Sequence, residues 1–186
     1  MDTLIRLHPT VLNWGEDLRQ GVVHRLDKAT SGLIICAYEE KFFNQIKEEF
    51  ASRSVTKKYF AFVENTVTSD IGKIDAPIGV DPKNKARQKV TKNGRDSITK
   101  YQVIERRNSY NQLDVDLVTG RKHQIRTHLA YIGNPILNDK LYGGRGVSSL
   151  PPHAIGLHCH TLQFEVNNNE YIYKSEMPSY LENLIN

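Results

Sequence analysis

Residues 111–133 read NQLDVDLVTGRKHQIRTHLAYIG and combine two different hydrophobic periods. The letters LDVDL at 113–117 alternate apolar with acidic residues, which is the pattern of a strand with one buried face. Apolar residues then recur at helical spacing, at Ile125, Leu129 and Ile132, and Gly133 and Pro135 end that pattern. The stretch predicts a half-buried strand followed directly by a short helix.

Short strands dominate the rest of the chain. Alternating or continuous apolar residues predict strands at 33–37, 59–63, 99–103 and 162–166, and residues 65–97 are expected to be loop with short strands. Helical spacing of Phe43, Ile46 and Phe50 predicts an amphipathic helix over about 39–52, and a short helix is expected after Pro178. Because short gaps favour antiparallel pairing, we predict an α+β fold with a mixed, mainly antiparallel β-sheet flanked by helices.

The composition excludes several classes of protein. The chain has 186 residues, of which 39% are hydrophobic and 25% charged, so it is expected to form one globular domain rather than a disordered or collagen-like chain. The sequence contains no run of 18 consecutive apolar residues, so no membrane helix is predicted. The N-terminus lacks the layout of a secretion signal. Cys36 and Cys159 suggest no disulfide framework, and Cys36 is expected to be buried in its apolar run. We therefore predict a reducing, cytoplasmic compartment.

Positive charge is concentrated in one segment. The net charge is +4, but residues 81–107 carry nine basic and three acidic side chains, so this segment is at +6 and the remainder at −2. Such a concentration attracts phosphate backbones. On charge alone, a solvated loop explains the segment at least as well.

Two polar stretches are denser than folding requires. Asp27 lies in the stretch HRLDKATSG at 24–32, directly before the predicted strand at 33–37, where a carboxylate can be partly desolvated. An ordinary turn aspartate that caps Thr30 or Ser31 is an equally good interpretation. Tyr59 lies on the predicted strand KKYFA at 57–61 and would serve either core packing or stacking of a nucleobase.

A third stretch, TGRKHQIRTHL at 119–129, gathers cationic residues at a helix start, where phosphate binds well. Arg126 adjoins Ile125 on the apolar side, so it is expected to point inward and to need a carboxylate partner. His123 and His128 do not share a helix face, and three ligands cannot converge from HCH at 158–160, so no metal site is predicted. The glycine motifs of nucleotide-binding loops and nucleophile elbows are missing, so no nucleotide cofactor is predicted.

Together, these stretches resemble the RluA-type pseudouridine synthase family. The resemblance rests on GVVHRLDKATSGL at 21–33, KYFA at 58–61, GRKHQIRTHL at 120–129, GNPILNDKLYG at 133–143 and LH at 157–158. Their order and spacing agree from about residue 17 to the C-terminus. The resemblance implies the family's catalytic fold with a central active-site cleft, and isomerisation of specific uridines in rRNA or tRNA to pseudouridine after base flipping. It implies neither a cofactor nor a metal.

The resemblance also implies residue roles. Asp27 would be the catalytic aspartate acting at the ribose C1′ or C2′, Tyr59 would stack on the target uracil, and Arg126 would pair with Asp27. Arg25 would insert where the flipped nucleotide leaves its stack, and Ile125 and Leu157 would line the site. Binding of the RNA backbone is expected from the remaining basic candidates, which are Arg121, His123, Lys83, Lys85, Arg87 and Lys89.

Two departures from the family pattern stand out. Ala29 occupies a position that is usually acidic in the family. Only 23 residues precede His24, without the Lys-Pro-Gly-like strand or the S4 domain of some members, so residues 1–186 are expected to be an N-terminally short catalytic domain, acting as a monomer on structured RNA. This short lead keeps open an alternative, a catalytically impaired RNA-binding module that retains the family fold.

Overall fold

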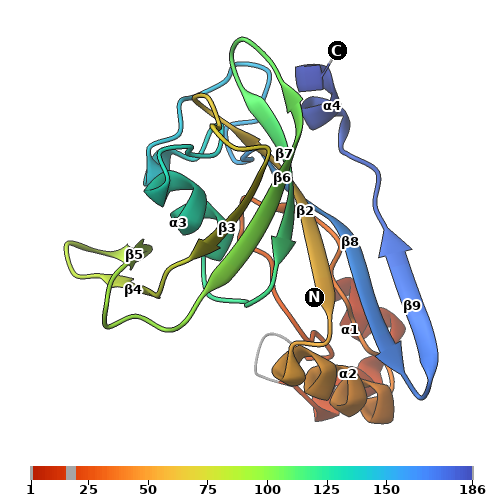
Figure 1. Cartoon of the computed structure of the whole chain (residues 1–186). Helices are drawn as coiled ribbons and strands as arrows, with labels where there is room; N and C mark the ends of the chain where they lie inside the picture. Colours follow the sequence, from red (N-terminus) through yellow and green to blue (C-terminus); the bar gives the residue numbers. More distant parts are fainter. Residues whose placement is uncertain (1, 16–19, 186) are drawn as a thin grey trace.

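The computed structural model describes residues 2–15 and 20–185 (Figure 1). Its helices are α1 (Asp2–Leu7), α2 (Glu40–Ser52), α3 (Gln124–Tyr131) and α4 (Ser179–Ile185), with 3-10 turns η1 (Pro9–Asn13) and η2 (Lys140–Tyr142). Its strands are β1 (Ser31–Gly32), β2 (Thr56–Val63), β3 (Ile71–Asp75), β4 (Ile78–Asp81), β5 (Asn84–Val90), β6 (Ile98–Arg106), β7 (Asn111–Leu117), β8 (Leu157–Val166) and β9 (Asn169–Lys174). None of the described helices combines the length and hydropathy needed to cross a bilayer.

Seven strands form one twisted sheet in the order β1-β8-β2-β7-β6-β3, with β9 also paired to β8. Only the short β1–β8 pair is parallel, and the other pairs of this sheet are antiparallel. β4 and β5 form a separate two-stranded hairpin. The predicted mixed, mainly antiparallel α+β fold is confirmed.

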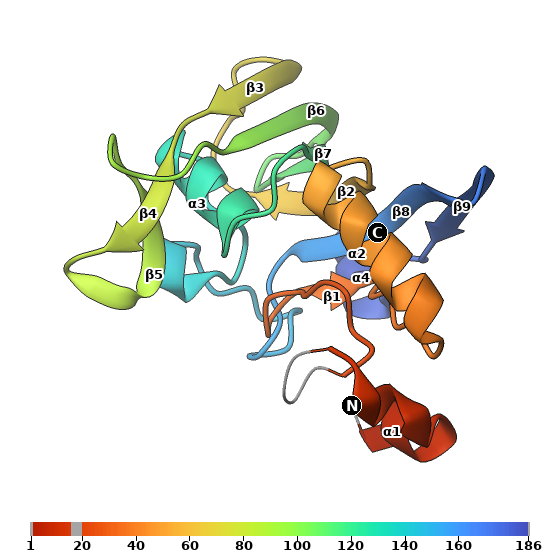
Figure 2. The same ribbon diagram turned by 90° about the horizontal axis from the view of Figure 1, so that it is seen from below.

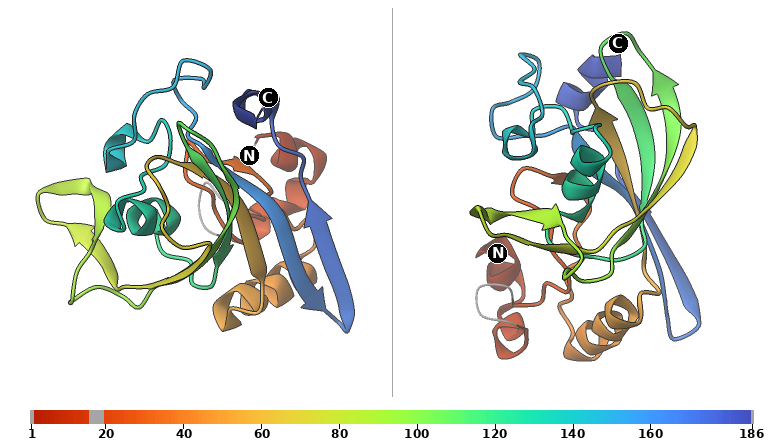
Figure 3. Two further views of the ribbon diagram at one scale, coloured as in Figure 1. Left: turned by 45° about the horizontal axis from the view of Figure 1, so that its top comes forward. Right: turned by 60° about the vertical axis from the view of Figure 1, so that its left-hand side comes forward.

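α3 lies against one face of the sheet, and the β4–β5 hairpin extends beside it (Figures 2 and 3). Ile125 and Leu129 of α3 are buried in the same core as Tyr59, Leu113 and Val115 of the central strands. Separate clusters place α4 over the opposite side near Phe62 and α2 against the end of β8. The strand-then-helix unit read from residues 111–133 is therefore the centre of the fold.

Two sequence expectations are wrong, and one cause explains both. Residues 33–37 form no strand, because β9 pairs with β8 from Thr161 onward and occupies the edge along which a longer β1 would have to run. The segment leaves the sheet with Ile34 49% exposed, and Cys36 is exposed rather than buried. In addition, the first 15 residues contain α1 and η1, for which the sequence offered no prediction.

Candidate active site

The loop that carries Asp27 is held by a hydrogen bond within its own turn and by the pairing of its C-terminal end with β8. The Thr30 amide donates to the Asp27 carbonyl at 2.9 Å, and Ser31 Oγ is hydrogen-bonded to His158 Nδ1 at 2.9 Å. Gly32 has φ of 114°, and a Cβ there would lie 2.2 Å from the Cys159 carbonyl oxygen, so only glycine permits this close parallel pairing. The carboxylate of Asp27 therefore projects from a turn with a defined backbone.

His24 braces the same loop from the other side. Its Nε2 accepts the Ile35 amide at 2.9 Å, and its ring stacks on Phe50 of α2 with centroids 4.8 Å apart. Burial, reinforced by the charge of Lys57, lowers the pKa of His24 to about 4. A neutral imidazole is thus available at neutral pH as the acceptor that joins the loop to α2.

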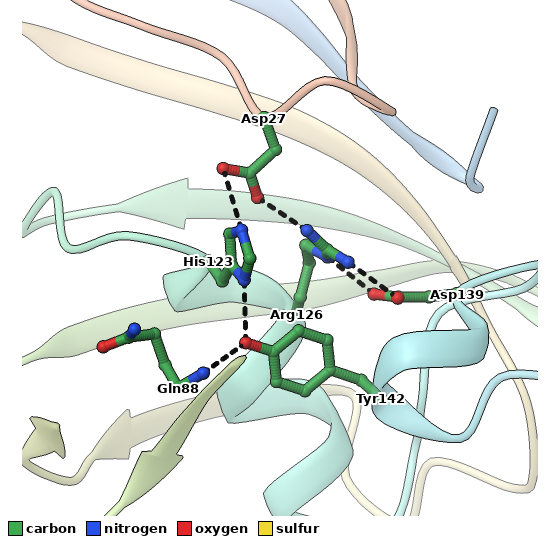
Figure 4. Close-up of polar contacts among 6 residues, drawn as sticks. All are labelled: Asp27, Gln88, His123, Arg126, Asp139 and Tyr142. Atoms are coloured by element: carbon green, nitrogen blue, oxygen red, sulfur yellow. Dashed lines mark hydrogen bonds and ion pairs between the residues drawn. The ribbon is translucent and has the colours of Figure 1, made fainter. Parts of the chain in front are cut away.

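Arg126 projects from α3 and joins two carboxylates (Figure 4). Its Nη1 donates to Asp27 Oδ2 at 3.2 Å, while Nε and Nη2 donate to Asp139 at 2.7 and 2.8 Å. Burial alone would lower the pKa of Arg126, but the bonds and charge of Asp139, followed by Asp27, outweigh it and leave that pKa raised. The side chain of Asp139 is only 1% exposed, so the bidentate pair holds the guanidinium in one orientation toward Asp27.

His123 faces the second oxygen of the Asp27 carboxylate. His123 Nε2 lies 3.8 Å from Asp27 Oδ1, and Nδ1 lies 2.9 Å from the Tyr142 hydroxyl. That hydroxyl accepts the backbone N–H of Gln88, on β5, at 2.8 Å. Figure 4 shows this chain of contacts running from the hairpin to Asp27.

A pocket of about 60 Å³ opens onto these groups and contains Tyr59 and Asp27 together. Its other lining residues include Arg25, Leu26, Thr30, Leu117, Arg121, His123, Gln124, Ile125, Arg126 and Leu157. Burial, and then the neighbouring Cys159 and Asp27, raise the pKa of Tyr59 well above its ordinary value. Tyr59 therefore presents a protonated, apolar ring beside a carboxylate, which suits an uncharged planar ligand.

The basic candidates fall into distinct groups in space. Arg25 is exposed at the pocket, and Arg121, partly buried, donates to the Asp96 carbonyl at 3.2 Å. Lys83 and Lys85 are exposed on the hairpin, Lys89 is half-buried, and Arg87 pairs with Asp81 at 2.9 Å. His123 is largely buried and faces Asp27 and Tyr142 rather than solvent.

The basic residues of segment 81–107 do not lie together in the structure. Residues 98–106 form β6, and a strand of this length carries the chain about 30 Å from the hairpin. Arg106 and Arg107 at its far end pair with Asp70 and Glu105. The free positive charge near the pocket is therefore that of the hairpin and the adjoining loops.

A larger hollow of about 590 Å³ lies between α2 and the β8–β9 turn. Glu48, Glu49, Glu165 and Glu170 line it, so it repels phosphate. Within residues 2–15 and 20–185, no group of three or more His, Cys, Asp or Glu side chains is placed to hold a metal ion. His158 and His160 instead make hydrogen bonds to Ser31 and Asp114.

Comparisons with known proteins identify the family of this chain. A family model described as RNA pseudouridylate synthase matches residues 12–131. The chain belongs to this family. A Bacillus subtilis protein named "Uncharacterized RNA pseudouridine synthase YlyB" is 36% identical over 170 residues, which cover 90% of this chain and 55% of that protein. A Borreliella burgdorferi protein named "Ribosomal large subunit pseudouridine synthase D" is 35% identical over 170 residues, covering 90% and 52%.

The fold agrees as well. The solved structure titled "Human RNA Pseudouridylate Synthase Domain Containing 4" superposes with a TM-score of 0.77 over 97% of this chain and 80% of that chain, at 24% identity. The chain spans about half the length of the curated relatives it matches.

As a member of the pseudouridylate synthase family, the chain places its three predicted catalytic residues in one pocket, although they lie far apart in sequence. The interpretation of Asp27 as a side-chain cap of Thr30 or Ser31 is not supported, because the Thr30 amide donates to the Asp27 carbonyl and the carboxylate contacts Arg126. Sequence reasoning missed Asp139 and Tyr142 as site residues. An inward Arg126 required a carboxylate, and Asp139 lies within the quoted motif GNPILNDKLYG, which was the available signal.

Proposed function

We propose that the chain isomerises uridine in RNA to pseudouridine, with Asp27 as the catalytic carboxylate. The observation that supports this most directly is the meeting of the Asp27 carboxylate, the Arg126 guanidinium and the Tyr59 ring in one pocket. A carboxylate held by a buried arginine can serve as the nucleophile that attacks a sugar carbon or as the base that removes a proton. The neighbouring aromatic ring offers a platform for the uracil.

The chemistry is balanced by the substrate itself. The N1–C1′ bond breaks, the uracil turns, C5 bonds to C1′, and the proton that leaves C5 is replaced by one on N1. Asp27 acts at C1′ as nucleophile or at C2′ as base, and Arg126 compensates its charge throughout. Since no net oxidation or phosphate transfer occurs, the reaction calls for no cofactor.

The target base must leave its stack to reach Asp27. Extrusion costs a few kcal/mol and is least costly in loops, so structured RNA with an unpaired uridine is the expected substrate. Arg25 at the pocket is placed to fill the vacated position, and Arg121, Lys83, Lys85, Arg87 and Lys89 to contact the backbone. We expect the RNA to be ribosomal or transfer RNA, since one relative is named for the large ribosomal subunit.

All these groups come from one chain, which supports a monomer as the active form. Both cysteines are free thiols, and we place the reaction in the reducing cytoplasm.

A pocket of about 60 Å³ has room for water-sized occupants, so entry of a nucleobase requires the lining side chains to shift.

The test uses the full chain and RNA transcripts labelled with tritium at C5 of uridine. Pseudouridine formation releases the tritium, and Asp27→Asn should lower this release by more than about a thousandfold while RNA binding persists. Near-normal release by Asp27→Asn would contradict the assignment. Binding by the unmodified chain without tritium release from rRNA or tRNA would instead favour the impaired RNA-binding module.

A further inference from the structure

The two oxygens of the Asp27 carboxylate have different surroundings. Oδ2 accepts Arg126 Nη1 at 3.2 Å, whereas Oδ1 has His123 Nε2 at 3.8 Å, beyond hydrogen-bond length. Both side chains line the pocket that contains Tyr59. Among the residues that the structure describes, Oδ1 therefore accepts no hydrogen bond, and the edge of His123 lies beside it.

The contacts behind His123 favour one position for its ring proton. The Tyr142 hydroxyl already accepts the Gln88 N–H at 2.8 Å, and burial raises the pKa of Tyr142, so the phenol keeps its proton. That proton is available to His123 Nδ1, which lies 2.9 Å away. An imidazole that accepts at Nδ1 carries its hydrogen on Nε2, and this hydrogen is directed at Asp27 Oδ1.

The backbone of His123 also shows that its position is imposed. It lies in the left-handed region with φ of 53° and ψ of 24°, immediately before α3. A non-glycine residue there is uncommon and persists when its surroundings hold it. The Tyr142 bond and the edge-on packing of the two rings, with centroids 5.7 Å apart, provide that restraint.

We propose that His123 is a positioning residue that directs Oδ1 of Asp27, and that Tyr142 and the Gln88 backbone connect it to the basic hairpin. This inference rests on the proposed function. Gln88 lies on β5 between Arg87 and Lys89, so the strand assigned to backbone binding also sets the donor beside the catalytic carboxylate. The contact shortens to a hydrogen bond when RNA occupies the pocket, since catalytic hydrogen bonds are often long before substrate binds.

The charge state of His123 follows from its neighbours. Burial lowers its pKa, and the charge of Asp27 opposes that shift. The other charged groups that act on it are Arg126, Lys122 and Asp139. The pKa of His123 therefore lies below the ordinary histidine value of 6.5, and the ring is neutral at neutral pH. In Asp27→Asn the opposing charge is removed, so the pKa of His123 should fall further.

The kinetic test compares Tyr142→Phe with His123→Asn in the full chain. Phenylalanine retains the ring whose centroid lies 4.9 Å from the Arg126 guanidinium, and asparagine tolerates the left-handed backbone. Each change should lower kcat for tritium release by about 10- to 100-fold and leave KM for RNA within about twofold. The exposed Tyr131→Phe on α3 is the matched control and should leave both values unchanged.

The double variant tests whether the two residues act in series. In the His123→Asn background, Tyr142→Phe should change kcat by less than about twofold, because the connection is already broken. Independent, multiplying effects would overturn the proposal. So would near-normal kcat in both single variants of an active chain, and that result would leave the proposed function intact.

Long-range ¹H–¹⁵N spectra of the histidines give a readout that needs no activity. We expect the Nε2–H tautomer for His123, its loss in Tyr142→Phe, and a lower His123 pKa in Asp27→Asn. An Nδ1–H tautomer in the unmodified chain, or a titration that neither variant alters, would overturn the inference. Since these spectra require no RNA, the inference can be tested even if no pseudouridine is formed.

Discussion

Two clusters on opposite faces of the sheet combine an aspartate, a histidine and a cation. In the first, Asp27 meets Arg126 at 3.2 Å and faces His123 at 3.8 Å. In the second, Asp114 of β7 meets His160 at 3.1 Å and Lys58 at 3.5 Å. By these distances alone, the second cluster is the more tightly paired one.

Their surroundings differ in what they leave available. His160 stacks flat on Phe60 with centroids 3.9 Å apart and also bonds Thr161, so its ring is fully engaged in packing. The side chain of Lys58 is 44% exposed, and water screens its attraction to Asp114. Arg126 is 8% exposed and has a second carboxylate, Asp139, and within residues 2–15 and 20–185 Oδ1 of Asp27 accepts no hydrogen bond. The Asp114 cluster therefore contributes to the stability of the sheet, whereas the Asp27 cluster leaves a carboxylate oxygen that can react with a ligand.

The largest expected difference between the two clusters is the loss of stability when the cation of each is removed. Arg126→Gln leaves Asp139 buried and Asp27 partly buried without a counter-charge, and should lower the free energy of unfolding by about 3–5 kcal/mol. Lys58→Gln removes an exposed partner and should lower it by less than about 1 kcal/mol. Urea denaturation measures both. Arg126→Lys, which retains the charge but loses the bidentate geometry, should fall between them. Equal losses in the two clusters would refute this contrast.

Neutralising Asp139, the second carboxylate bound by Arg126, tests whether the orientation of Arg126 matters as well as its charge. Asp139→Asn weakens the bidentate pair that directs Arg126 and should reduce single-turnover tritium release by about 10- to 100-fold. The same substitution at Asp114 should change that rate by less than about twofold, because it acts on the far face of the sheet. If Asp114→Asn proved as damaging as Asp139→Asn, the assignment of the active face would be wrong.

The smallest expected effect is on the salt dependence of RNA binding, which depends on the exposed basic residues near each cluster. Lys83→Gln and Lys85→Gln on the hairpin should each reduce the slope of log K for RNA binding against log salt by about 0.7 to 0.9. Arg106→Gln and Arg107→Gln, at the far end of β6 and already paired with carboxylates, should leave the slope unchanged. Filter binding over a range of KCl concentrations distinguishes these outcomes. A slope that responds only to Arg106 and Arg107 would place the RNA elsewhere.

The sequence predicted the burial of Arg126 correctly, but it predicted neither the partner of Arg126 nor the end of the sheet at β1. The neighbours of Arg126 on the apolar stripe of a short helix required it to point inward, and it is buried as expected. The partner Asp139 was not predicted although it lies within the quoted motif GNPILNDKLYG, because periodicity does not show where a side chain in a turn points. The strand expected at 33–37 failed for a similar reason, since local apolar content cannot show that β9 already occupies the edge of β8.

By itself, the sequence determined the alternating strand and short helix at 111–133, the mixed antiparallel class and the residues that carry the family pattern. These depend on spacing along the chain, where side-chain periodicity directly reports which face is buried. Only the tertiary structure decided that Asp27, Tyr59 and Arg126 share a pocket, that Asp139 directs Arg126, and that the hairpin reaches His123 through Tyr142. Those contacts join segments up to 99 residues apart, and their geometry is set by how the sheet and α3 pack.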